Sequence, residues 1–111
     1  MRLRLILGLL LVAVMSFAQT HSVTLTWTDT SNPAGTTYSV YRVVGLCSGS
    51  PTFAKIATAV TDKTYIDTTV QPGNYCYTVT ASFNGAESSP SNSEPALVLP
   101  FPPTGLTAVV Q

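Results

Sequence analysis

A strictly alternating run in the second half of the chain constrains the fold most. It follows a Pro72-Gly73 turn and carries aromatic and β-branched side chains with a period of two. That pattern is typical of a half-buried β-strand. The two faces of the run are Tyr75, Tyr77, Val79 and Ala81 on one side and Cys76, Thr78 and Thr80 on the other.

The rest of the chain after residue 18 also has the pattern of short strands and turns. Asn84-Gly85 is the favoured pair for a two-residue hairpin turn. The following strand is broken by Pro90 and Pro95, which suits a sheet edge. No stretch has apolar residues at helical spacing, so the sequence predicts an all-β sandwich or barrel. The expected strands cover residues 22–28, 36–44, 52–57, 65–70, 74–83, 86 onward and 96–99, with turns at 29–35 and 60–63.

Residues 1–18 have the pattern of a signal peptide. Arg2 and Arg4 precede an apolar run over residues 5–15, and Ala18 closes a segment of small residues at which cleavage is expected. As a helix that run spans roughly 16 Å, about half a bilayer core, so no stable membrane insertion is expected after cleavage. The predicted localisation is secreted, periplasmic or cell-surface.

The charge that remains after cleavage excludes one class of partner. Three Lys and Arg residues and five Asp and Glu residues follow residue 18, so the net charge is 3 − 5 = −2. Nucleic acid or an anionic membrane requires clustered cations. Neither is therefore an expected partner.

The two cysteines, Cys47 and Cys76, are expected to form a disulfide. Export would take them to an oxidising compartment, where pairing is the default. Closing a loop of 76 − 47 = 29 residues stabilises a fold by roughly 3–4 kcal/mol. Two free thiols are the alternative. Two cysteines and a distant His21 fall short of a tetrahedral metal set, so neither a metal nor a cofactor is predicted.

The sequence does not predict an enzyme. His21 is the only histidine and is expected to be solvated, so no nucleophile–base pair can be assembled around it. Asp29, Asp62 and Asp67 are candidates for a calcium site or a glycosidase carboxylate pair. Asp29 and Asp62 lie in turn-like sequence, where an aspartate usually binds its own backbone. No catalytic residue is assigned.

One aromatic set is a candidate binding surface. Tyr41, Phe53 and Phe83 in a Thr-rich surface would suit a polysaccharide. Cross-strand packing explains the same residues more simply.

The order of the strand motifs resembles a fibronectin type III domain of the kind found in secreted bacterial proteins. The resemblance covers most of residues 22–99. Its motifs are VTLTW (23–27), YSVYR (38–42), YID (65–67), VQPG (70–73), YCYTVTA (75–81) and GAESSPSN (85–92).

The resemblance implies an immunoglobulin-like β-sandwich with strands A-B-E in one sheet and C′-C-F-G in the other. Tyr75 would be the corner tyrosine, whose hydroxyl bonds back to the chain near the preceding turn. The Cys47–Cys76 bridge, which most members of the family lack and which is expected from this sequence alone, would hold the loop after strand C against the sheet. The expected core is Val23, Leu25, Trp27, Tyr38, Val40, Tyr75, Tyr77 and Val79.

The chain departs from this family at both ends of the expected domain, residues 19–99. After cleavage only Gln19-Thr20-His21 would precede residue 22, which leaves almost no room for strand A, whereas residues 100–111 look like a Pro-rich linker followed by a strand A. In the implied topology the return to the vacant position is roughly 25 Å, and residues 100–103 reach only about 13 Å. The tail could be disordered or lie along the edge strand, start a truncated second domain, or complete the sheet of another copy.

The functional prediction is a non-catalytic exported module for protein interaction, adhesion or structural spacing. The alternatives are a carbohydrate-binding accessory module and a surface subunit that assembles by donor-strand exchange. The expected partners are a protein or a polysaccharide, with head-to-tail self-association through residues 100–111 as a third case.

Overall fold

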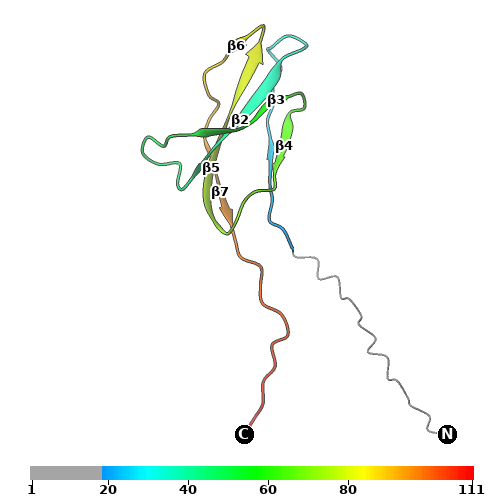
Figure 1. Cartoon of the computed structure of the whole chain (residues 1–111), viewed down its shortest axis with the longest axis vertical. Helices are drawn as coiled ribbons and strands as arrows, with labels where there is room; N and C mark the ends of the chain where they lie inside the picture. Colours follow the sequence, from blue (N-terminus) through cyan, green and yellow to red (C-terminus); the bar gives the residue numbers. More distant parts are fainter. Residues whose placement is uncertain (1–18) are drawn as a thin grey trace, which may run out of the picture.

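The computed structural model describes residues 19–111. The described chain contains strands and no helix (Figure 1). The predicted signal peptide, residues 1–18, lies outside the described residues. The strands are β1 (Val23–Thr26), β2 (Thr37–Val44), β3 (Ala54–Val60), β4 (Thr64–Asp67), β5 (Gly73–Phe83), β6 (Ala86–Glu87) and β7 (Glu94–Val98).

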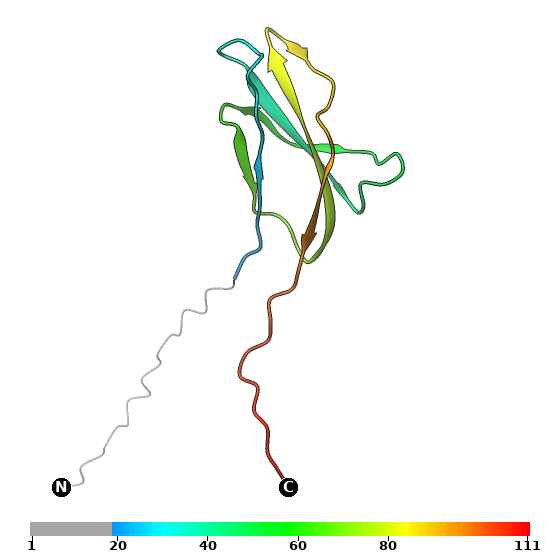
Figure 2. The ribbon, with the colours of Figure 1, turned by 180° about the vertical axis from the view of Figure 1, so that it is seen from behind.

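The strands form two antiparallel sheets, so the predicted all-β, sandwich-like class is confirmed. β1 and β4 form the smaller sheet. The larger sheet has the order β3-β2-β5, and β6 and β7 pair one after the other along the free edge of β5. β1 begins and β7 ends at the same end of the molecule, as both views show (Figure 2). There the rings of His21 and Phe101 stack with centroids 4.0 Å apart. Beyond that contact, residues 102–111 form no strand and lead away from the sheets.

The core lies between the sheets, on the face of β5 that carries Tyr75 and Tyr77. Tyr38, Val40, Tyr75 and Tyr77 are buried as expected. The other four expected core residues, Val23, Leu25, Trp27 and Val79, are half-buried and pack against the buried cluster. The expectation that Trp27 and Val79 are sealed from solvent is therefore wrong. A groove runs between β1 and β5, and the side chains of Trp27 and Val79 each have one side open to it.

Two core residues were not predicted, and both lie near the ends of strands. Val70 precedes the turn into β5, and Val98 ends β7; they are 2% and 8% exposed. The strand predicted over residues 65–70 includes Val70, but β4 ends at Asp67. The cause is local, because the Asp67 carboxylate accepts hydrogen bonds from the amide and hydroxyl of Thr69 and turns the chain there. β3 instead runs to Val60, three residues past its predicted end.

The hairpin after β5 forms as predicted. Asn84 and Gly85 have φ values of 49° and 78°, the positive pair that this two-residue turn requires. β6 then pairs with the end of β5 for two residues. Pro90 interrupts the edge between β6 and β7, and β7 pairs with the beginning of β5.

Serine side chains bridge that interruption. The amide of Ala81 donates to Ser88 Oγ at 2.9 Å, and the amide of Val79 donates to Ser91 Oγ at 3.0 Å. In return the amides of Ser88 and Ser91 donate to the carbonyls of the same two residues, at 2.7 and 2.8 Å. The hydroxyls thus take the place of strand carbonyls, and β5 keeps its hydrogen-bond partners across the break.

Candidate functional site

The most connected polar cluster joins the two sheets through one buried carboxylate. Asp67, at the end of β4, is 2% exposed. Its Oδ2 accepts hydrogen bonds from Arg42 Nη1 and from the Tyr77 hydroxyl, both at 2.8 Å. Its Oδ1 accepts two hydrogen bonds from Thr69, at 3.0 Å and 2.7 Å. Both carboxylate oxygens are therefore fully engaged by the protein's own donors.

The strand register brings these groups together. Arg42 on β2 lies directly opposite Tyr77 on β5, so both side chains point to the inner face. The guanidinium also lies over the ring of Tyr75, 5.3 Å from its centroid. The sequence analysis did not predict this cluster. Arg42 shares its strand face with Tyr38 and Val40, and a charged residue on the core-facing side of a strand indicates a buried partner.

The pKa values in this cluster follow from its hydrogen bonds. Burial raises the pKa of Asp67, but the bonds donated by Thr69, Tyr77 and Arg42 outweigh burial and hold the pKa at about 2. For Tyr77, burial and the bond to the carboxylate both raise the pKa of the phenol. Asp67 is thus an anion and Tyr77 a neutral donor at physiological pH, which suits a structural clamp.

Asp29 organises a turn, as the sequence suggested. Its Oδ1 accepts from the amides of Ser31 and Asn32 at 3.2 and 3.1 Å. Its Oδ2 accepts from the Asn32 side chain and the Tyr38 hydroxyl, each at 2.7 Å. These bonds, with the Asn32 side chain contributing most, hold the pKa of Asp29 well below its usual range.

The remaining residues considered for catalysis do not join a site. Asp62 is exposed in the turn before β4. His21 was expected to be solvated, and that is wrong: it is half-buried because its ring stacks on Phe101. Within residues 19–111, no three His, Cys, Asp or Glu side chains gather where they could hold a metal ion.

The predicted Cys47–Cys76 disulfide is present, with Cα atoms 5.2 Å apart. Cys76 lies on the outer face of β5, and Cys47 is in the loop between β2 and β3. The bridge holds that loop against the central strand of the larger sheet. Cys76 is fully buried beneath it.

The candidate aromatic surface is not assembled as one patch. Tyr41 lies opposite Thr78, on the outer face of the larger sheet. Phe83 is an odd number of residues from Thr78 along β5 and so points to the inner face. Tyr41 is also engaged, since its hydroxyl donates to Glu87 and Lys55 Nζ lies 5.5 Å from its ring centroid. The half-buried Phe53 precedes β3.

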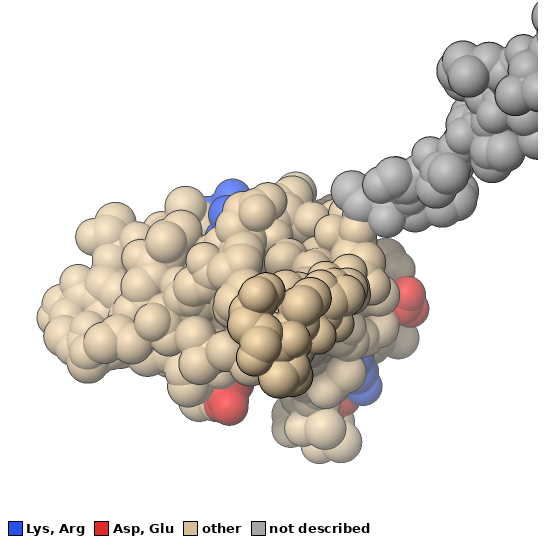
Figure 3. All heavy atoms as spheres, turned by 90° about the horizontal axis from the view of Figure 1, so that it is seen from below, with Lys and Arg blue, Asp and Glu red and all other residues tan. Residues whose placement is uncertain are grey.

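The surface itself carries few charges. Figure 3 views the molecule from the end where residues 99–111 leave, and shows only isolated acidic and basic side chains among uncharged residues. Residues 95–111 contain no charged side chain at all. In the part of the chain that the structure covers, no helix is long and apolar enough to cross a membrane.

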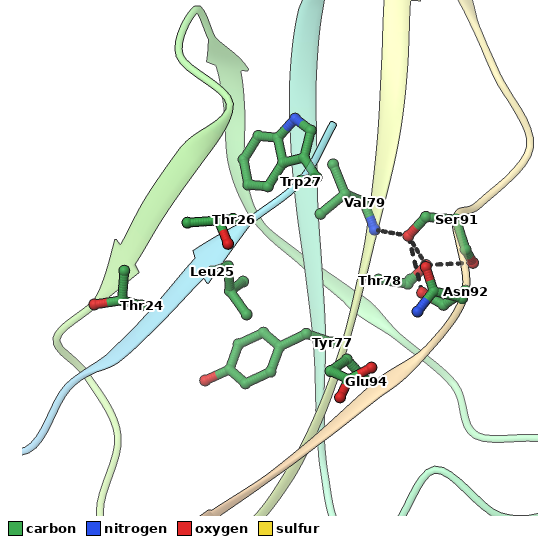
Figure 4. Close-up of a pocket in the computed structure, with 10 residues that line it drawn as sticks. All are labelled: Thr24, Leu25, Thr26, Trp27, Tyr77, Thr78, Val79, Ser91, Asn92 and Glu94. Carbon is green, nitrogen blue, oxygen red and sulfur yellow. Dashed lines mark hydrogen bonds between the residues drawn. The ribbon is translucent and has the colours of Figure 1, made fainter. Parts of the chain in front are cut away.

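A groove of about 280 Å³ opens between the sheets beside β1. One wall is the free side of β1, the floor is Tyr77 and Val79 on β5, and the other wall is the segment that leads into β7 (Figure 4). Leu25, Trp27 and Val79 give it an apolar lining. The sequence did not predict this groove.

Comparison with known proteins adds no family: no family model matches this sequence, and no curated protein matches it either.

Proposed function

We propose that this chain is an exported, non-catalytic module of fibronectin type III type that serves protein interaction, adhesion or structural spacing. The observation that carries the proposal is the strand order, with β1-β4 facing β3-β2-β5 and the β6/β7 edge. This order matches strands B-E and C′-C-F-G of the family once strand A is left out. The amide of Gln71 donating to the Tyr75 hydroxyl at 2.9 Å supports it further, because this is the bond expected of a corner tyrosine.

The non-catalytic part of the proposal rests on how the polar groups are used. The carboxylates of Asp67 and Asp29 each bind several donors of their own chain. A general base or nucleophile needs a free oxygen directed at a substrate. The two most connected carboxylates therefore act as structural groups.

Export can be tested by expressing the full chain in a bacterium with a general secretory pathway. We expect the protein in the periplasm or medium, with Gln19 as its first residue and no titratable thiol. Cytoplasmic protein that retains residues 1–18 would contradict the proposal.

A polysaccharide partner is tested on the same exported protein by titration with soluble glycans. Trp27 is the only tryptophan and lines the groove, so its fluorescence reports binding there. We expect no saturable change. Saturable quenching that survives Tyr41→Ala but is lost in Leu25→Asp, which changes the groove lining and keeps the Trp27 reporter, would replace the proposed function with carbohydrate binding in the groove.

A further inference from the structure

Among residues 19–111, β1 has a strand partner on one edge only. Its strand partner is β4, and the amide of Trp27 extends the pairing by donating to the Lys63 carbonyl at 3.1 Å. In an antiparallel pair the residues alternate between facing the partner and facing away. The N–H and C=O groups of Thr24 and Thr26 therefore point to the side of β1 opposite β4. Such an edge is a template for another strand.

The groove runs along this same edge, so an added strand would also find a place for side chains. Leu25, Trp27 and Val79 line it, and Glu94 is its one charged lining residue (Figure 4). The indole Nε1 of Trp27 is buried and makes no hydrogen bond within residues 19–111. Buried donors of this kind normally have a partner. The edge thus offers backbone groups and apolar surface to one incoming segment.

The C-terminal tail has the properties of that segment. Residues 104–110 contain no proline and no charge, so every amide in them can donate. In an extended chain Leu106, Ala108 and Val110 share one face. Leu106 and Val110 are 98% and 96% exposed, so they pack against nothing within residues 19–111.

The tail is badly placed to fill its own groove. It leaves the sandwich at the end where β1 begins, next to the stacked rings of His21 and Phe101. An antiparallel partner of β1 has to start at the other end, beside Trp27. Pro102 and Pro103 also keep the backbone before them extended, so the chain continues away from the sheets.

We propose that residues 104–110 of one copy add as an antiparallel strand to β1 of a second copy, with Leu106, Ala108 and Val110 in the groove. Each copy gives a tail at one end and receives one beside β1. The contact is therefore heterologous and need not close, which builds head-to-tail chains. This inference goes beyond the proposed function, because a monomer would still be an exported module.

The donor side is tested with Leu106→Asp/Val110→Asp, compared with Val109→Asp as the matched control on the opposite face. Light scattering over a range of concentrations should show oligomers for the native exported chain. The double variant should weaken self-association about 100-fold, because two apolar side chains lose their burial. Val109→Asp should change it by less than about threefold, as a surface substitution does.

The acceptor side is tested with Thr24→Pro. Proline is tolerated at an edge position whose N–H faces outward, so this variant should keep β1 paired with β4. It lacks the N–H that an added strand needs, so it should not bind a tail. At a concentration where the native chain is oligomeric and a 100-fold weaker association is not populated, the double tail variant and Thr24→Pro should each be monomeric alone. Mixed, they should form dimers and nothing larger, since only one functional tail and one functional edge remain in each pair.

A second measurement keeps the test decisive if Thr24→Pro does not fold. A synthetic peptide of residues 100–111, added to the double tail variant, should shift Trp27 fluorescence saturably, whereas the peptide with both Asp substitutions should not. Native chain that stays monomeric at every concentration would overturn the inference. So would equal disruption by Val109→Asp, or a monomer in which deletion of residues 100–111 shifts Trp27 fluorescence, since its own tail would then occupy the edge. The export and glycan tests would stand in each case.

Discussion

At the scale of single residues, the buried Asp67 links three strands. Its partners Arg42 and Tyr77 come from β2 and β5, so one carboxylate at the end of β4 ties the smaller sheet to the larger one. A buried charge is tolerated only when its lone pairs are satisfied. Here Thr69 completes the set, and the same bonds that satisfy Asp67 also end its strand.

The depressed pKa of Asp67 predicts how stability depends on pH. The pKa is about 2 in the folded protein and about 3.9 in an unfolded chain. The folded state therefore binds fewer protons, so its added stability is complete above about pH 5 and is lost as the pH falls through 4 towards 2. Between pH 5 and 2 the free energy of unfolding should fall by about 2 kcal/mol more in the native protein than in Asp67→Asn.

Chemical denaturation at each pH measures this difference. Asp62→Asn is the matched control, because Asp62 is exposed, and it should follow the native protein. Parallel curves for the native protein and Asp67→Asn would show that the carboxylate does not hold the sheets together.

At the scale of elements, the central strand β5 is held on its outer face by the disulfide. The bridge ties the loop after β2 to Cys76 and closes a loop of 29 residues. Replacing both cysteines with alanine should lower the free energy of unfolding by about 3 kcal/mol, because the unfolded chain regains that loop's freedom. Urea denaturation of the double variant, with reduced native protein as the control, measures the loss. A difference below 1 kcal/mol would contradict it.

The edge of the larger sheet depends on the serine that bridges the gap at Pro90. Ser91→Ala removes the acceptor of the Val79 amide and should cost about 1 kcal/mol. Hydrogen exchange at that amide should accelerate, whereas Ser93→Ala, at an exposed position two residues along, should leave it unchanged. Equal exchange in both variants would mean that water replaces the hydroxyl without loss.

Local patterns in the sequence predicted much of this architecture. Period-two alternation located β5, and Asn84-Gly85 located the hairpin, because both signals act between chain neighbours. The Asp67 cluster could not be predicted in this way, since it needs the register of β2 against β5 and the packing of one sheet on the other. The serine bridges depend on the same long-range register. The alternation of β5 already places Phe83 on the inner face, so the sequence was sufficient to separate Phe83 from Tyr41.

At the scale of the whole molecule, the smaller sheet is the less complete layer. β1 and β4 cover a larger sheet whose central strand is paired on both sides. Trp27 is half-buried and Leu106 is exposed, and the proposed tail exchange would cover both. The mixing experiment with Thr24→Pro addresses both at once.

The disulfide also determines how the molecule would respond to tension. A force applied through residues 21 and 101, which lie side by side, would peel β1 and β7 apart from one end. The cross-link would keep the 29-residue span between Cys47 and Cys76 from lengthening. At about 3.5 Å per residue, roughly 100 Å of contour stays locked, so the oxidised module is a much shorter tether than its reduced form.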